Sequence, residues 1–140
     1  MPTYMEAIET KIDLFYSCIM SGRAEEAKDY VTSNFVLEEA LELPYSQSKY
    51  NGLTEVSNFF KELNTLIEIM GTPEIKISVP SASLAFAVIS FPVKVRKTGV
   101  EFKFEAIEML SIVDGRIAYV KPHYFRQKPF LDVIQNSVST

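Results

Sequence analysis

Two glutamates stand on strand faces that are otherwise apolar. In the segment VEFKFEAIEMLSIV, every second side chain on the face of Glu108 is apolar, and Glu39 takes the same place in the shorter segment FVLEEAL. Its neighbour Glu38 points to the other face and is expected in solvent. A carboxyl group in an apolar surface costs free energy unless it is paired, kept neutral or placed at a cavity. The pattern therefore marks Glu39 and Glu108 as candidate functional groups.

Two such carboxyls suit proton transfer on a carbonyl compound. A carboxylate can move a proton between carbon atoms as a general base. A second carboxylic acid, kept protonated by an apolar pocket, can donate a hydrogen bond to the developing oxyanion. The alternative is a pair of cavity carboxyls that binds buried water, contacts Tyr45 or Tyr50, or reaches solvent.

Other polar side chains are weaker candidates. His123 is the only histidine, but it alternates with Lys121 on the less apolar side of its strand, which predicts the outer face of the sheet. Tyr45, Tyr50 and Tyr124 could orient a ligand through their hydroxyls, or could pack as core rings with the hydroxyl at the rim.

Composition excludes several classes of function. The chain has 140 residues, with 14 basic and 18 acidic side chains, and so lacks the cationic surface that nucleic-acid binding needs. One histidine and one cysteine cannot build a typical zinc site, and the isolated glycines form no phosphate loop. A lone Cys18 and the absence of a leader-like N-terminal segment are typical of a cytoplasmic protein. The longest apolar run, residues 84–89, is too short to span a bilayer.

Three helices are predicted in the N-terminal half. The first begins at a capping box of Thr3 and Glu6 and ends near Gly22. A short second helix covers residues 23–31. The third covers residues 53–70, where apolar side chains recur every three or four positions and form the most hydrophobic helix face in the chain.

The remaining segments alternate as strands. Strands are predicted at residues 35–41, 74–79, 84–97, 100–113 and 116–125. The pair Asp114-Gly115 is typical of a tight hairpin turn, and Pro92 inside a strand indicates an edge or a bulge. This order predicts an α+β fold in which three N-terminal helices pack on a strongly curved, mainly antiparallel sheet, a cone with an internal cavity. Residues 1–127 are expected to form one domain, and residues 128–140 a partly disordered tail.

The order of elements resembles the nuclear transport factor 2-like superfamily, and within it the SnoaL-like and ketosteroid-isomerase-like enzymes. The similar motifs are Ile19-Met20-Ser21-Gly22, Tyr30-Val31, Phe35-Val36-Leu37-Glu38-Glu39, Leu43-Pro44-Tyr45, Tyr50-Asn51-Gly52, Phe59-Phe60 and Val113-Asp114-Gly115-Arg116-Ile117. They extend over residues 5–125. The resemblance implies a fold but no particular reaction, because this fold hosts enzymes and binding modules alike.

The ketosteroid-isomerase-like branch implies specific roles. Its base is a carboxylate on the first strand, a position that falls on Glu39. Its second carboxylic acid lies on the penultimate strand and falls on Glu108. Its helix-one tyrosine falls on Phe15, a departure from the family, and the adjacent Tyr16 would need a shifted register. The limonene-epoxide-hydrolase pattern fits worse, since its arginine falls on Ala106.

The resulting hypothesis is a protein that binds a small hydrophobic molecule in the cone cavity. The preferred activity is cofactor-independent isomerisation or aldol-type cyclisation, with Glu39 as base and Glu108 as oxyanion donor. The alternative is a non-catalytic ligand-binding or dimerisation module. The expected ligand contacts are Phe15, Tyr16, Leu43, Tyr45, Tyr50, Phe60, Val120, Pro122 and Tyr124. The expected partners are the ligand and a second copy across the outer sheet face; no metal, organic cofactor, nucleic acid or membrane is implied.

Overall fold

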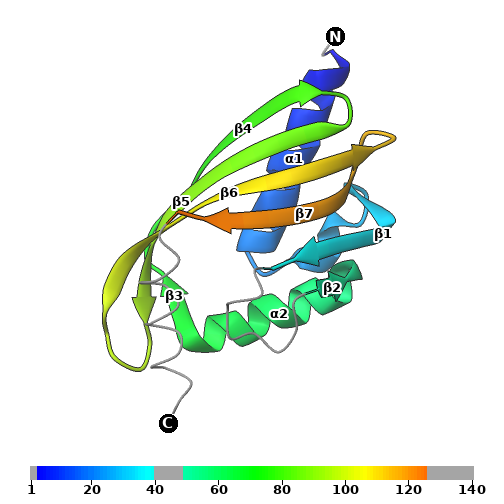
Figure 1. Ribbon diagram of the computed structural model, residues 1–140. Coiled ribbons are helices and arrows are strands. Elements are labelled where there is room, and N and C mark those ends of the chain that lie inside the picture. Colours follow the sequence, from blue (N-terminus) through cyan, green and yellow to red (C-terminus); the bar gives the residue numbers. More distant parts are fainter. Residues whose placement is uncertain (1–2, 40–48, 126–140) are drawn as a thin grey trace.

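Two helices and a short 3-10 turn pack on a curled sheet in the computed structural model, which describes residues 3–39 and 49–125 (Figure 1). Helix α1 spans Tyr4–Met20, the 3-10 turn η1 spans Ala24–Ala27, and helix α2 spans Gly52–Leu66. None of the helices in these described ranges is long and apolar enough to cross a membrane. The predicted Leu43, Tyr45 and tail 128–140 lie outside the described residues.

The start of α1 follows the predicted capping pattern. The Thr3 hydroxyl accepts a hydrogen bond from the backbone N–H of Glu6 at 3.1 Å, which satisfies one of the free donors of the first turn. The helix ends before Gly22, whose φ of +76° lies in the left-handed region that glycine adopts without strain. The Thr3 half of the predicted capping box and the glycine at the C-terminal end are therefore confirmed.

Two of the predicted helices differ from the structure. The second is only the 3-10 turn η1, because the chain becomes extended at Val31 to pair with the last strand. The third ends at Leu66 rather than at residue 70. Ile67 and Ile69 instead form a short strand, since alternating β-branched residues fit a strand as well as the three-four spacing fits a helix.

The sheet is mixed and contains seven strands in the described residues. They are β1 (Val31–Glu38), β2 (Lys49–Asn51), β3 (Ile67–Ile69), β4 (Glu74–Ser81), β5 (Leu84–Val95), β6 (Glu101–Val113) and β7 (Arg116–Tyr124). Their order is β2-β1-β7-β6-β5-β3, and β4 also pairs with β5. Strand β1 is parallel to β7, whereas the other pairs are antiparallel. The predicted curved, mainly antiparallel sheet is confirmed apart from this one parallel pair.

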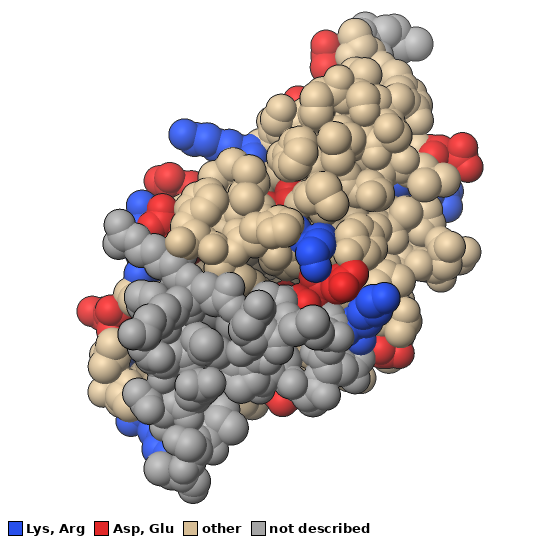
Figure 2. Space-filling model, in the orientation of Figure 1, with Lys and Arg blue, Asp and Glu red and all other residues tan. Residues whose placement is uncertain are grey.

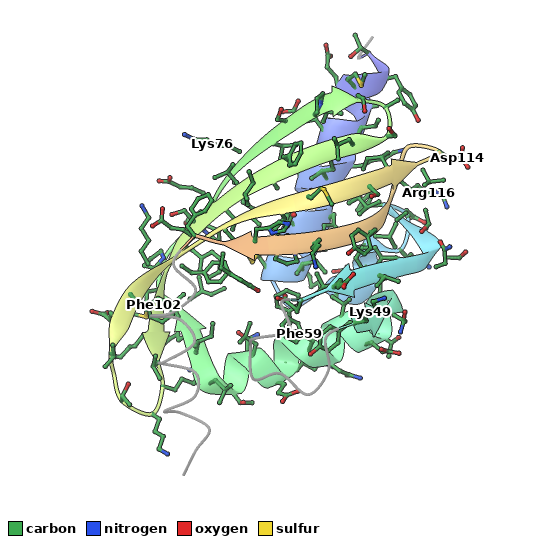
Figure 3. All side chains as sticks on the ribbon, viewed as in Figure 1. Lys49, Phe59, Lys76, Phe102, Asp114 and Arg116 are labelled. Atoms are coloured by element: carbon green, nitrogen blue, oxygen red, sulfur yellow. The ribbon has the colours of Figure 1, made fainter. Side chains whose placement is uncertain are left out.

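The β6–β7 hairpin turns where predicted. Asp114 and Gly115 have φ values of +52° and +76°, the combination that a type I′ turn requires. The turn sets the register in which Val113 faces Arg116. Asp114 and Arg116 lie at the tip of the hairpin, far from α2 (Figure 3).

Pro92 lies where β5 changes its neighbour. Strand β4 pairs with β5 up to Ser90, and β3 pairs with β5 from Val93 onward. Pro92 has no N–H to donate, but its carbonyl accepts a hydrogen bond from the Met70 N–H at 2.9 Å, and it faces Lys103 across the β5–β6 ladder. Strand β5 is therefore an inner strand, with β6 on one side and β4 and β3 on the other, and the prediction that Pro92 lies at an edge is wrong.

Alternation along the strands separates the core from the outer face. Ala106 and Leu110 of β6 are fully buried on the side that faces α1, and Glu108 stands between them. Phe35 and Leu37 of β1 are buried on the same side. In Figure 1, α1 lies behind the strands, so the outer face of the sheet is turned toward the reader.

Candidate active site

A cavity lies between the curved sheet and the two helices. Its volume is about 70 Å³. Aromatic and aliphatic side chains line most of it: Phe15, Tyr16, Ile19, Met20, Phe35, Leu37, Val56, Phe59, Phe60, Leu63, Ile67, Ile69, Ile89, Phe91, Phe104, Val120 and Tyr124. The remaining lining residues are Glu39, Glu108 and Asn64. The two glutamates that strand alternation singles out thus line one apolar cavity.

Glu108 is hydrogen-bonded to a tyrosine of the first helix. The hydroxyl of Tyr16 on α1 donates to Oε1 of Glu108 on β6, at 2.6 Å. Tyr16 is buried, and its ring meets that of Phe15 edge-on at 5.2 Å between centroids. Both neighbouring aromatics of α1 line the cavity, but only Tyr16 brings a hydroxyl to the acid.

The surroundings of Glu108 favour its protonated form. Burial among apolar groups raises the pKa of Glu108 to about 7, although the Tyr16 hydrogen bond lowers it in part. The pKa of Tyr16 lies well above its usual value, because of burial and then the charge of Glu108 and its hydrogen bond. Near neutral pH, Glu108 therefore divides between acid and carboxylate, while Tyr16 keeps its proton.

Glu39 forms a second carboxyl–tyrosine pair. It directly follows β1 and is 4% exposed, the one charged side chain among the buried residues of the described chain. The hydroxyl of Tyr124, on β7, donates a hydrogen bond to Oε2 of Glu39. A tyrosine of β7 thus holds the carboxyl group of Glu39, which follows β1 in the chain.

The two pairs meet on one part of the sheet. Tyr124 faces Ala106 across the β6–β7 ladder, and Glu108 lies two residues further along β6 on the same face. Diagonal neighbours of this kind lie roughly 7–8 Å apart. A small molecule in the cavity can therefore contact both pairs at once.

The structure brings together some predicted ligand contacts and not others. Phe15, Tyr16, Phe60, Val120 and Tyr124 line the cavity. Tyr50 and Pro122 are not among its described lining residues. Tyr50 is buried with its ring 4.6 Å from that of Phe59, and Pro122 is buried opposite Glu108.

Further cavity residues were not predicted, and they include several phenylalanines among a larger number of aliphatic side chains. The rings of Phe91 and Phe104 stack at 4.7 Å between centroids, and Phe104 meets Tyr124 edge-on at 5.3 Å. Phe59 projects from α2 (Figure 3) and is buried. Phe104 shares its strand face with Glu108, so alternation could have assigned it to the cavity. Nothing in the sequence separates Phe59 and Phe91 from ordinary core residues.

The outer face holds a second polar cluster. Tyr119 donates a hydrogen bond to Oε1 of Glu38, and Nζ of Lys121 lies 3.8 Å from Oε2 of the same carboxyl. The hydrogen bond from Tyr119 is the main cause that lowers the pKa of Glu38. Burial, and then the carboxyl, raise the pKa of Tyr119 to about 12. Glu38 therefore points outward as predicted, but it has partners that the sequence did not indicate.

His123 lies on this outer face as well. It is exposed and pairs across the ladder with Ile107, whose side chain points to the same side. It is therefore separated from the cavity by the sheet. Among the described residues, no group of His, Cys, Asp and Glu side chains could hold a metal ion.

Comparison with solved structures identifies the fold. A protein of Burkholderia pseudomallei described as NTF2-like and of unknown function matches with a TM-score of 0.74 and 12% identity, over 91% of this chain and 97% of its own. A ketosteroid isomerase-like protein of Erwinia carotovora matches with a TM-score of 0.64 and 16% identity, over 89% and 98%. A candidate SnoaL-like polyketide cyclase of Mesorhizobium loti matches with a TM-score of 0.65 and 18% identity, over 88% and 100%.

These matches show that the chain has the NTF2-like cone fold over nearly its full length. Proteins of this fold include candidate isomerases and polyketide cyclases. No family model and no curated protein matches the sequence. The comparisons thus define the fold, and the reaction has to be argued from the cavity.

Proposed function

We propose that the protein is a cofactor-independent enzyme that transfers a proton on a small hydrophobic carbonyl compound, as an isomerase or a cyclase. The observation that carries this proposal is the pair of carboxyls at one apolar cavity, each bonded to a tyrosine hydroxyl. We assign Glu39 the role of base, as its place after the first strand implies, and Glu108 the role of hydrogen-bond donor, which its raised pKa of about 7 supports.

The reaction needs only these side chains. The Glu39 carboxylate takes a proton from the carbon next to the carbonyl, and the electron pair of that C–H bond moves toward the carbonyl oxygen. Protonated Glu108 donates a hydrogen bond to the resulting enolate oxygen, and Tyr16 steadies Glu108. Glu39 then returns its proton to another carbon, which completes an isomerisation. In a cyclisation the enolate carbon instead attacks a second carbonyl of the same molecule, and the resulting alkoxide takes the proton from Glu39.

Hydrogen exchange at carbon tests this mechanism before the natural substrate is known. The protein is mixed with small ketones in deuterated water, and proton NMR follows the loss of hydrogen next to the carbonyl. The variants Glu39→Gln and Glu108→Leu should each slow exchange by roughly 100-fold or more. Outward-facing acids provide the matched controls: Glu38→Gln for the first variant and Glu105→Leu for the second. An unchanged exchange rate in both cavity variants would refute the roles assigned to Glu39 and Glu108.

A second copy of the chain is the proposed partner on the outer face of the sheet. Phe86, Val88, Ile107 and Met109 lie there on neighbouring strands, and Val88 is 37% exposed. Figure 2 looks onto this face, whose upper part is mostly tan, with charged groups at the edges and near the middle of the view. Lys76 and Lys49 lie toward opposite margins (Figure 3). An apolar patch with a charged rim is typical of an association surface. The alternative function, a binding or dimerisation module without catalysis, would use the same patch.

A cytoplasmic location is part of the proposal. It is supported by the chain's single cysteine, Cys18, which is buried as a thiol. Proteins of reducing compartments keep such thiols unpaired.

A further inference from the structure

The size of the cavity limits what it can hold. Its volume of about 70 Å³ is roughly half that of an apolar cavity that takes up a benzene ring. Tyr124 and Phe104 at its wall are only partly buried, so the substituents of a ligand can extend past them. One ring fits after small side-chain shifts, whereas fused ring systems would require the sheet and α2 to separate.

The shape of the wall favours a flat ligand. Phe91 and Phe104 stack with an angle of 24° between their rings. Phe59 and Phe60 meet edge-on on the α2 side, at 5.1 Å between centroids. Aromatic walls of this kind gain most from another planar ring, which can stack on one face and meet ring edges on the other.

The charge of the wall disfavours ions. The lining residues in the described part of the chain include two acids and no Lys, Arg or His. An anionic ligand would lose its hydration without gaining a cation, beside Glu39 and Glu108. An organic cation would lose its hydration in the apolar cavity, a cost that pairing with a buried carboxylate often fails to offset. It would also hold both carboxyls in their charged form, so that no neutral acid would remain to donate to a carbonyl oxygen.

We propose that the substrate of this site is an uncharged carbonyl compound with a single planar ring. This inference rests on the proposed function and narrows its substrate class. The ring lies among the phenylalanines, and the carbonyl oxygen points toward Glu108 and Tyr16. The carbon that loses its proton then lies on the side of Glu39 and Tyr124.

Three molecules of nearly equal shape test whether the cavity prefers an uncharged ligand. Acetophenone is neutral, benzoate is its anionic counterpart, and benzamidine is its cationic counterpart. Binding is measured by titration calorimetry at pH 6, below the pKa of about 7 of Glu108. Acetophenone should bind at least about tenfold more tightly than either ion, a difference of 1.4 kcal/mol. Equal or tighter binding of benzoate or benzamidine would overturn the inference.

A series of ketones with one to three fused rings tests the size of the ring system that the cavity accepts. Acetophenone, 2-acetylnaphthalene and 2-acetylanthracene carry the same ketone on one, two and three rings. Affinity should fall with each added ring. The variant Phe60→Ala, which enlarges the cavity, should bind the two-ring ketone at least about tenfold more tightly than the unaltered protein does. Leu63→Ala, on the same cavity wall, repeats the test if the first variant does not fold. Lys61→Ala, exposed on α2, is the control. Equal or tighter binding of the larger ketones by the unaltered protein would contradict the inference.

Binding and turnover separate this inference from the proposed function. Deuterium exchange into the methyl group of bound acetophenone is followed in the same samples. Binding with the expected selectivity but without exchange would refute the reaction and keep the ligand class. Exchange together with tighter binding of larger or charged compounds would keep the reaction and refute the ligand class.

Discussion

The Tyr16 hydroxyl lies 2.6 Å from a carboxyl oxygen of Glu108, although the two residues are 92 positions apart in the chain. The bond ties helix α1 to the middle of β6. It also limits how far burial raises the pKa of the acid, since a donor stabilises the carboxylate. The contact therefore holds the acid in place and, together with burial as the larger effect, determines the pH range in which it changes charge.

Removing the Tyr16 hydroxyl should change the titration of Glu108. In Tyr16→Phe the carboxylate loses its donor, so the pKa of Glu108 should rise further. Above neutral pH, the variant should also lose about 1–3 kcal/mol of unfolding free energy. Carbon NMR of labelled glutamate measures the titration, and denaturant unfolding measures the stability. Tyr119→Phe is the matched control. The Tyr119 hydroxyl donates a hydrogen bond to Glu38, so its removal should leave the titration of Glu108 unaffected. An unchanged titration in Tyr16→Phe would show that this hydrogen bond does not influence the pKa of Glu108.

Glu108 should make the protein less stable as pH rises toward neutral. Its pKa is about 7 in the folded chain against an ordinary 4.5. Between these values the folded chain keeps a proton that the unfolded chain has released, so the unfolding free energy falls with increasing pH. The loss should amount to about 3 kcal/mol across this window.

The variant Glu108→Gln isolates this effect, because an amide does not titrate. Chemical denaturation from pH 4.5 to 8 should give a curve for the unaltered protein that falls relative to that of the variant. The lowered pKa of Glu38 acts in the opposite sense at more acidic pH, but both proteins share it, so it cancels in the difference. Parallel curves would show that Glu108 titrates normally.

Arg96 should stabilise the C-terminal end of α2. Its Nε donates to the backbone carbonyl of Asn64 at 2.7 Å, and its ion pair with Glu68, at 4.0 Å and well exposed, should contribute little. Arg96→Ala should therefore cost about 1 kcal/mol of unfolding free energy. Lys97→Ala, the exposed neighbour, should cost much less in the same denaturation experiment. Equal losses would mean that the bond to Asn64 contributes nothing.

A charge on the outer face should prevent association. Light scattering should give the unaltered protein about twice the mass of one 15.9 kDa chain. Val88→Glu should return the mass of one chain, because two buried carboxylates would face each other. Val100→Glu is the control, since Val100 is also exposed but lies in the turn before β6. A single-chain mass for the unaltered protein would refute the proposed dimer.

Strand alternation was the most informative part of the sequence. It assigned Glu39 and Glu108 to the inner side and His123 to the outer side, because a strand commits every second side chain to one face. Helix positions were less certain. Phe15 and Tyr16 are adjacent and both line the cavity, so counting along the chain could not show which of them reaches Glu108.

Contacts between distant strands could not be read from the sequence. The bond from Tyr119 to Glu38 depends on the parallel pairing of β1 with β7. The bond from Tyr124 to Glu39 likewise joins two residues that are 85 positions apart in the chain. The strand β3 was hidden because its residues continued the periodicity of α2. Long-range pairing decided all three features, and local pattern contains little information about it.

The change of partner at Pro92 divides strand β5 into two parts. The first part pairs with β4, which packs on α1, and the second part pairs with β3, which directly follows α2. Ile89 and Phe91 of β5, next to this change of partner, line the cavity together with Ile67 and Ile69 of β3. The cavity wall therefore spans the joint at which the two parts of the sheet meet, so a substitution at this joint would affect both the sheet and the cavity.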